Sequence, residues 1–161
     1  MTVKVFISHQ QSDSETAGRI AYRLRAVHQI ECYLDVIDPN TRQAGNELGD
    51  YIRMQLGTCT QLLAVVSEST KTSWWVPWEI GVATEKDQPI ATFSTGFYVT
   101  LPEYLKKWPY LQSERDLDEY ARVSKETDRA LTSRKTHLRE AVAQHQSTAD
   151  FYRVLRSRLG Q

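Results

Sequence analysis

Cysteine is scarce in this sequence, and long apolar runs are absent. Its 161 residues include only two cysteines, Cys32 and Cys59, which form no C-x-x-C pair and are too few for a disulfide framework. No apolar run approaches the roughly 18 residues of a membrane-spanning helix, and the N-terminus enters a strand pattern without a charged and apolar leader. We therefore expect two buried, reduced thiols in a cytoplasmic protein with no membrane contact.

An excess of either charge is absent as well. The chain carries 20 basic and 20 acidic side chains, so no global field attracts it to nucleic acid or anionic lipid. The four histidines are scattered without metal-ligand spacing, and neither G-x-G-x-x-G nor a P-loop follows the first strand pattern. These absences predict no nucleic-acid partner, no metal and no tightly held dinucleotide cofactor.

The sequence does contain an alternation of strand and helix patterns. Short runs rich in strand-forming residues predict buried strands at 3–8, 30–36, 61–67 and 89–94, with a short edge strand at 108–112. Strands that alternate with helices indicate a parallel sheet with right-handed crossovers. We therefore predict the α/β class, a flavodoxin-like doubly wound parallel sheet of about five strands with helices on both faces.

The first helix has a local start signal. Ser12 and Glu15 form a capping-box pattern, and apolar residues repeat behind it at helical spacing: Ala17, Ile20, Ala21, Leu24 and Val27. Residues 50–56 supply a second, short amphipathic helix. The pattern thus predicts one helix after each of the first two strands, as a doubly wound sheet requires.

The C-terminal part is helical throughout. Residues 116–123 begin a helix, 126–144 continue the pattern, and 147–159 form a last segment for which Ser147 is the expected cap. We assign residues 1–123 to the α/β domain and 124–161 to C-terminal helices packed on the same domain.

Residues 73–81, SWWVPWEIG, place three tryptophans around one glutamate. Pro77 fits a first helical position and favours an extended Val76, which puts Glu79 in the first turn. There the helix dipole favours an ionised carboxylate. A purely structural account also stands, in which Trp75 packs against Ile80 as a hydrophobic staple and the other tryptophans are core.

Three polar segments should meet at the edge of this sheet. In doubly wound folds the ligand site lies at the carboxyl ends of the strands, where the strand order switches. Residues 9–13, 35–46 and the link after 61–67 all follow strands. We expect them to converge on one site.

Several of these segments together resemble the TIR (Toll/interleukin-1 receptor) domain. The resemblance rests on VKVFISHQQSD, ECYLDV, GNELGDYI and QLLAVVSESTKTSWWVPWE, in this order over residues 3–94. Ser73-x-Trp75-x-x-x-Glu79 looks like the signature of members that hydrolyse or cyclise NAD+. The resemblance implies an NAD+ nucleosidase or ADP-ribosyl cyclase, with Glu79 as the catalytic residue and NAD+ as substrate.

The implied reaction suits a single carboxylate. Nicotinamide leaves its pyridinium form as a neutral molecule, so the two-carboxylate arrangement of glycosidases is unnecessary. An oxocarbenium-like transition state still needs a preorganised anion nearby.

The resemblance also implies a substrate-binding set and a mobile loop. The set consists of Phe6, Ser8, His9, Asp35 and Trp75. Two of these have alternative readings, since His9 can be an exposed bystander at a strand end and Asp35 a turn-forming residue. Through the loop at 36–49, the resemblance implies self-association on activation. Arg42 in this loop either contacts a phosphate or is solvated.

The leading functional expectation is therefore an enzyme that converts NAD+ to nicotinamide and ADP-ribose, or to a cyclic or conjugated isomer. The chain resembles the TIR component of the Thoeris antiphage system, whose product activates a separate effector protein. Two alternatives remain: a non-catalytic scaffold acting through TIR–TIR contacts, and a secreted effector that interferes with host TIR signalling.

Overall fold

The chain forms one five-stranded parallel sheet in the order β2-β1-β3-β4-β5. The computed structural model describes residues 2–36, 46–68, 70, 75–94 and 103–161. The strands are β1 (Lys4–His9), β2 (Glu31–Val36), β3 (Gln61–Val66), β4 (Ile90–Ser94) and β5 (Tyr110–Leu111). The predicted doubly wound sheet is confirmed, including its short edge strand.

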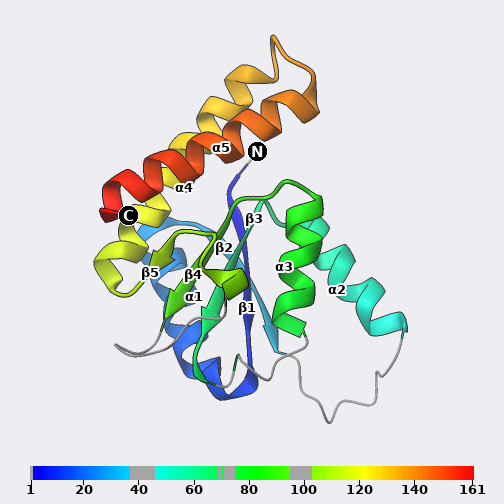
Figure 1. The fold of residues 1–161 in the computed structure, drawn as a ribbon, viewed down its shortest axis with the longest axis vertical. Coiled ribbons are helices and arrows are strands. Elements are labelled where there is room, and N and C mark those ends of the chain that lie inside the picture. The colour runs from blue at the N-terminus through cyan, green and yellow to red at the C-terminus, as the bar shows by residue number, and fades with distance from the viewer. Residues whose placement is uncertain (1, 37–45, 69, 71–74, 95–102) are drawn as a thin grey trace.

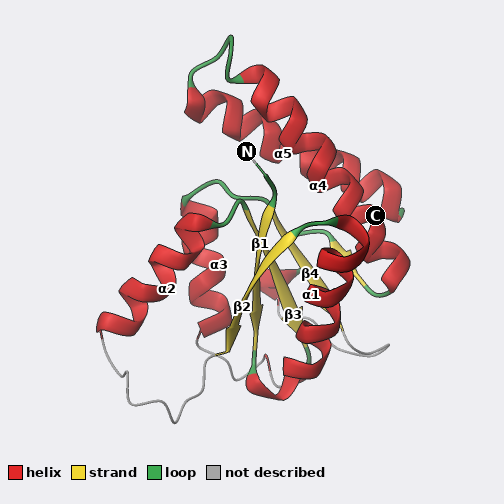
Figure 2. Cartoon of the chain, turned by 180° about the vertical axis from the view of Figure 1, so that it is seen from behind, coloured by secondary structure: helices red, strands yellow, loops and turns green. Residues whose placement is uncertain are grey.

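Helices cover both faces of the sheet. In Figures 1 and 2, α2 and α3 lie together on one side and α1 on the other, while α4 and α5 form a hairpin that extends past the end of the sheet. The helices are α1 (Ser14–His28), α2 (Asn46–Thr58), α3 (Trp75–Glu85), α4 (Glu114–Arg134) and α5 (Glu140–Leu159), with short 3-10 turns η1 (Gln11–Asp13) and η3 (Glu103–Leu105).

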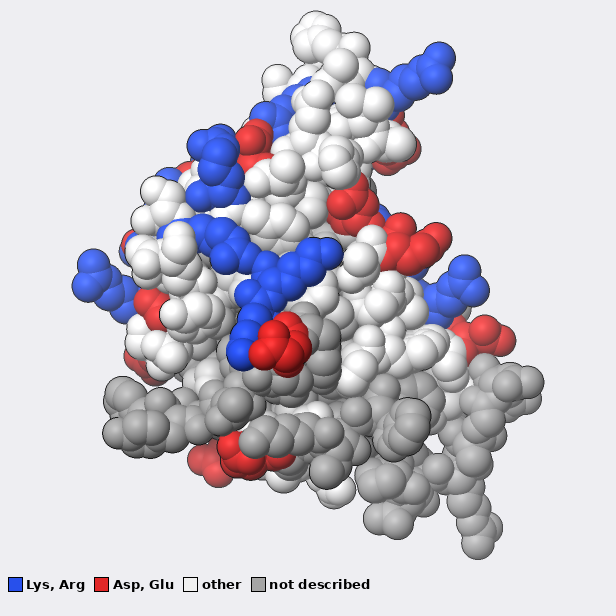
Figure 3. All heavy atoms as spheres, viewed as in Figure 1, with Lys and Arg blue, Asp and Glu red and all other residues white. Residues whose placement is uncertain are grey.

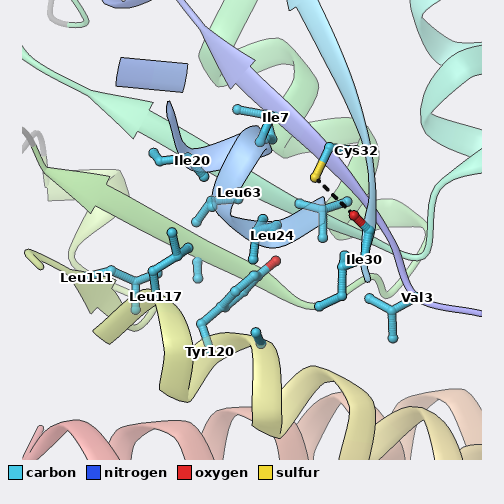
Figure 4. Close-up of a cluster of buried hydrophobic side chains, with 14 of the residues drawn as sticks. Val3, Ile7, Ile20, Leu24, Ile30, Cys32, Leu63, Leu111, Leu117 and Tyr120 are labelled. Carbon is cyan, nitrogen blue, oxygen red and sulfur yellow. Dashed lines mark hydrogen bonds between the residues drawn. The ribbon is translucent and has the colours of Figure 1, made fainter. Parts of the chain in front are cut away.

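Two hydrophobic clusters follow from the alternation of side chains along β1. Val5 and Ile7 belong to the cluster beneath α1 and α4, which Figure 4 shows with Leu24 and Tyr120 around it. Phe6 points the other way and belongs to the cluster beneath α2 and α3. The sheet is therefore covered on both faces, which explains why its strands are nearly continuous in apolar residues.

The start of α1 differs from the capping-box prediction. The helix begins at Ser14, and Ser12 lies in η1 instead of capping it. The N-cap position is taken by Asp13, whose side chain makes no cap hydrogen bond because it accepts one from Ser67. The predicted apolar face is buried except for Val27, which is 53% exposed near the end of the helix.

The start of α3 differs as well. The helix begins at Trp75, so Pro77 is its third residue and Glu79 its fifth, and each lies two positions further into the helix than predicted. Val76 is helical instead of extended. Its side chain is buried in the α2–α3 cluster, and this burial outweighs the local preference against helix before proline. Pro77 still fits, because the first four N–H groups of a helix have no partner within it.

The C-terminal helices break at a different place from the one predicted. α4 runs unbroken to Arg134, and the turn before α5 is closed by backbone hydrogen bonds from Lys135 to Leu131 and from Leu138 to Arg134. Ser147 lies inside α5 and caps nothing. Its hydroxyl donates to the Thr127 carbonyl of α4 at 3.2 Å, so its polar group serves the helix–helix contact.

The helical hairpin is joined to the sheet by specific contacts. The Tyr152 hydroxyl accepts from the Ile90 amide at 3.1 Å, and the Thr148 hydroxyl donates to the Asp87 carbonyl at 2.7 Å. Phe151 and Leu155 are fully buried. α4 crosses residues 123 and 124 without interruption, so the division of the chain at this point stays a prediction.

Charges of both signs are mixed over the surface. On the face in Figure 3, basic and acidic side chains alternate over the α4–α5 hairpin. Within the described parts of the chain, no helix is long and apolar enough to cross a membrane.

Candidate functional site

The strand order switches at β1. β2 lies on one side of β1 and β3 on the other, so the chain leaves the carboxyl ends of β1 and β3 in opposite directions. In doubly wound sheets this divergence opens a crevice that binds ligands. The residues that follow β1 and β3 are therefore the first candidates for a site.

A serine and a glutamate meet at this strand-order switch. Ser8, near the end of β1, donates a hydrogen bond from Oγ to Oε2 of Glu79 on α3. Both side chains are buried, with Glu79 only 1% exposed. Ser8 points to the α3 side because it has the same parity on the strand as Phe6. The fold thus holds one carboxylate, already hydrogen-bonded, at the strand-order switch.

A second carboxylate lies at the same edge. Asp13, in η1 after β1, is 7% exposed, and its Oδ2 accepts from the Ser67 hydroxyl at 2.7 Å. The Ser67 amide donates to Thr70 Oγ1 at 2.9 Å, which fixes the turn after β3. These bonds join the segments that follow β1 and β3, so the predicted convergence is confirmed for these two.

Phe6 lies two positions before Ser8 on β1. Its ring stacks on Tyr33 of β2 with centroids 5.3 Å apart. Tyr33 in turn lies 3.4 Å, hydroxyl to hydroxyl, from Tyr51 of α2. Phe6 is fully buried in the α2–α3 cluster, on the same face of β1 as Ser8.

His9 is buried, contrary to the alternative of an exposed bystander. Its Nδ1 lies 3.2 Å from the Ile7 carbonyl oxygen, a contact that requires the proton on Nδ1. His9 has the parity of Ile7, which faces the α1 cluster. Its predicted contact with substrate stays a prediction.

The remaining predicted residues are placed by their backbones. Asp35 pairs in register with Ser8 across the β1–β2 ladder, and Trp75 precedes Glu79 by four positions on α3, on the same helical face. Their side chains lie outside the described residues, as does Arg42. Most of the predicted 36–49 loop lies outside them too, although its last residues form the start of α2.

Neither cysteine is a nucleophile for this site. Both thiols are free and buried, as predicted, and burial raises the pKa of Cys32 to about 12. A thiol held protonated is a poor nucleophile.

Among the residues that the structure describes, no group of histidine, cysteine, aspartate and glutamate could hold a metal ion.

The arrangement can stabilise positive charge next to it. A carboxylate excluded from water acts in a low effective dielectric, where it interacts more strongly with a cation than it would in solvent. The Ser8 hydroxyl fixes its orientation.

Sequence reasoning placed residues 9–13 at this edge but did not single out Asp13 or pair it with Ser67. The sequence signal for this pair was that a polar residue follows each of two neighbouring strands.

Two solved structures are similar to this chain. A crystal structure of a prokaryotic SEFIR domain superposes with a TM-score of 0.52 at 14% identity, covering 77% of this chain and 91% of that one. The TIR domains of the activated Roq1 resistosome, which directly recognises the pathogen effector XopQ, give a TM-score of 0.46 at 15% identity, covering 99% and 98%. These similarities concern the fold alone.

No curated protein matches the chain significantly. The family model of the TIR domain matches residues 5–125. That range contains β1 from its second residue onward, β2 to β5, the strand-order switch, and both the Ser8–Glu79 and Asp13–Ser67 pairs. This chain belongs to the TIR domain family.

Proposed function

We propose that this protein cleaves the nicotinamide–ribose bond of NAD+, with Glu79 as the catalytic residue. The observation that carries the proposal is the buried Glu79 carboxylate, oriented by Ser8 at the strand-order switch of a TIR domain. NAD+ is the substrate in this proposal, and no further cofactor takes part.

The chemistry requires one anion and no acid. The bond between C1′ of ribose and the pyridinium nitrogen breaks with its electron pair passing to nitrogen, so nicotinamide leaves as a neutral molecule. The ribose ring is left with oxocarbenium character, which the Glu79 carboxylate stabilises electrostatically. Water then adds at C1′ and releases a proton to give ADP-ribose, or a nucleophile of the same molecule adds to give a cyclic isomer.

The other residues bind and position in this scheme. Ser8 keeps the carboxylate pointing into the crevice, and Phe6 supports the floor beneath it. Trp75, one helical turn before Glu79, supplies a flat apolar wall for nicotinamide or adenine. Asp35 and His9, at the ends of β2 and β1, bind the nucleotide.

The identity of the product, its biological role and the assembly of the protein are part of the same proposal. The product is a nucleotide signal of the Thoeris type that activates a separate effector protein in bacterial antiphage defence, made in the cytoplasm. Self-association through residues 36–49 completes the active site on activation.

A scaffold function is the second candidate, and one observation favours it. Three large apolar side chains are exposed on the paired helices α2 and α3, namely Tyr51, Met54 and Trp78. Exposed apolar groups on adjacent elements often mark protein–protein contacts. A scaffold would use this surface and leave Glu79 without a chemical role.

One experiment separates these functions. The full chain at high concentration is incubated with NAD+, nicotinamide release is followed by chromatography, and NAD+ binding is measured in parallel by calorimetry. We expect release by the wild type and loss of at least about a hundredfold with Glu79→Ala, the range set by removal of one preorganised electrostatic group.

Glu85→Ala is the matched control, because Glu85 lies on the same helix and is exposed. It should behave as the wild type. Activity that survives in Glu79→Ala would overturn the catalytic assignment. A wild type that neither binds nor cleaves NAD+ at any protein concentration would favour the scaffold.

A further inference from the structure

A separate cavity lies on the α1 side of the sheet. It has a volume of about 350 Å³, is open to solvent on one side, and is lined by α1, the end of β4 and the segment that leads from β5 into α4. This volume falls in the range of small-molecule sites, which starts at about 300 Å³. None of its lining residues belongs to the Ser8–Glu79 or Asp13–Ser67 pairs.

The cavity has an apolar floor. Ile20 of α1 and Leu117 of α4 are both almost fully buried, and Phe93 of β4 packs against the same cluster. These side chains come from three different elements, so the floor is fixed by the fold. An aromatic or branched aliphatic group placed on it would be removed from water, which is favourable.

Two arginines form the rim on one face of α1. Arg19 and Arg23 are four positions apart, so their guanidinium groups lie on the same helical face and repel each other. Arg23 is neutralised by Asp118, with bonds of 2.9 and 2.8 Å, and by Glu114 at 3.2 Å. Arg19 makes no ion pair with any described residue. The two arginines and the two carboxylates balance in charge, so the rim has no net positive charge, but the Arg19 guanidinium has no carboxylate partner among the described residues.

The rest of the wall is polar and contains one acidic side chain: it consists of Thr16, Ser94, Gln112, Ser113 and Glu114. Glu114 is paired with Arg23. Thr16 lies one turn before Arg19 on α1, and its hydroxyl can donate to an anion that a guanidinium already holds. The cavity thus combines an apolar floor with one guanidinium that has no carboxylate partner among the described residues and a neighbouring hydroxyl donor.

We propose that this cavity binds a small organic anion, with an aromatic or branched aliphatic body and a single phosphate or carboxylate group. The body lies on Ile20, Phe93 and Leu117. The anionic group lies against Arg19, since a planar guanidinium group binds both kinds of oxyanion in two-point geometry. The assignment is independent of the proposed NAD+ chemistry.

The test uses the full chain labelled with 15N and three matched probes, each with one phenyl ring. Phenyl phosphate and phenylacetate carry the two candidate anionic groups, and 2-phenylethanol is the neutral reference. We expect saturable shifts of the amide signals of Arg19, Ser94 and Leu117 with at least one anion. Binding should be roughly millimolar, as suits a probe of about ten heavy atoms. The tighter anion identifies the natural head group.

Three variants assign the binding to the cavity. Arg19→Gln should weaken binding of the preferred anion about tenfold, the effect of one charge-assisted contact. Thr16→Trp should block binding by filling the cavity, without a change of charge. Arg129→Gln is the control, because Arg129 is an exposed arginine on α4 without an ion pair among the described residues, and it should bind as the wild type does.

Three results would overturn the proposal. They are no saturable shift with either anion, equal affinity for 2-phenylethanol, and wild-type affinity in Arg19→Gln. Arg19 is exposed, so its substitution leaves the fold intact and the last result is always measurable.

Discussion

At the residue scale, burial of the Glu79 carboxylate has an energetic cost that its surroundings must offset. A carboxylate that leaves water loses its hydration, and hydrogen bonds from the protein must replace it. The Ser8 hydroxyl supplies such a bond to Oε2. Residues of this kind are retained for chemistry more often than for stability, which leads to two predictions about the pair.

Ser8→Ala should lower the proposed activity while Glu79 stays in place. Loss of the hydroxyl removes a hydrogen bond to a charged group, typically about 1.5–3 kcal/mol, so we expect kcat/KM for nicotinamide release to fall about 10- to 100-fold. Ser157→Ala, at an exposed position near the end of α5, is the control. Unchanged kinetics in Ser8→Ala would show that the hydroxyl does not orient the catalytic carboxylate.

Glu79→Gln should be inactive and yet at least as stable as the wild type. The amide keeps an oxygen to accept from Ser8 and removes a charge from a site that is 1% exposed. We expect the free energy of unfolding in urea to rise by about 0–2 kcal/mol, because removal of a buried charge from a functional site removes its desolvation cost.

The control for this second variant is Glu85→Gln, which should change stability by less than about 0.5 kcal/mol because Glu85 is exposed. A clear loss of stability in Glu79→Gln would mean that the negative charge itself is part of the structure, and the functional reading of its burial would fail.

At the element scale, one carboxylate joins α1 to α4. Asp118 of α4 accepts two hydrogen bonds from Arg23 of α1, at 2.9 and 2.8 Å, and lies 2.7 Å from His28 Nε2. The hydrogen bond from Arg23 is the main cause that holds the pKa of Asp118 well below its usual value, with a further contribution from His28. The ionised form is therefore favoured in the folded state.

The sign of the pH dependence follows from this depressed pKa. The unfolded chain binds a proton at Asp118 near its ordinary pKa of about 3.9, whereas the folded chain does so only at lower pH. The stabilisation is fully present above pH 4 to 5 and is lost as pH falls towards the folded pKa.

Asp118→Asn should therefore lower the free energy of unfolding by about 1–2 kcal/mol at pH 7, a range reduced because Arg23 is partly exposed. The difference from the wild type should shrink below pH 4. Urea unfolding at pH 7 and pH 3 measures both values. Glu126→Gln, which breaks an exposed pair with Arg158, should have little effect. A constant difference at both pH values would contradict the assigned role of the charge.

The sequence predicted strands better than helix starts, for a physical reason. A buried parallel strand needs only a short run of apolar residues, so residues 61–67 corresponded closely to β3. A helix start depends on which partner a polar side chain finds. Asp13 pairs with Ser67, 54 positions away, and burial of Val76 extends α3 backwards. Neither contact is visible in a local pattern.

The same limit applies to the candidate site. Ser8 was predicted from the family resemblance, and Glu79 from the resemblance and from its place near a helix start, and the structure brings the two together. Asp13 was missed because nothing local distinguishes it from other polar residues after a strand. Its pairing depends on the order of β1 and β3 in the sheet, which is a property of the whole fold.

At the scale of the whole molecule, the question is whether the C-terminal helices fold with the sheet. Phe151 of α5 lies edge-on to Tyr120 of α4 at 5.9 Å and to Tyr152 at 5.7 Å, between ring centroids. It belongs to the same buried cluster as Val5 and Ile7 of β1. This continuity indicates one cooperative unit, although the family match ends at residue 125.

The four tryptophans allow a direct test, because all of them precede α4 in the sequence. Trp75 and Trp78 lie on α3 and Trp108 lies just before β5, so their fluorescence reports on the part of the chain that precedes α4. Circular dichroism at 222 nm, in contrast, is dominated by the long helices. If Phe151 belongs to a single core, Phe151→Ala should lower the free energy of unfolding by about 3–5 kcal/mol, the usual cost of such a cavity. Both signals should move together, as two-state unfolding requires.

Val142→Ala is the control, since Val142 is exposed on the same helix and should change stability by less than about 0.5 kcal/mol. If the C-terminal helices were an independent unit, Phe151→Ala would make part of the circular dichroism signal disappear at lower urea concentration. The transition followed by tryptophan fluorescence would stay where it is in the wild type. Coincident shifts would instead mean that α5 stabilises the strands that carry Ser8. Loss of packing far from the crevice would then reduce the amount of active protein without touching the site itself.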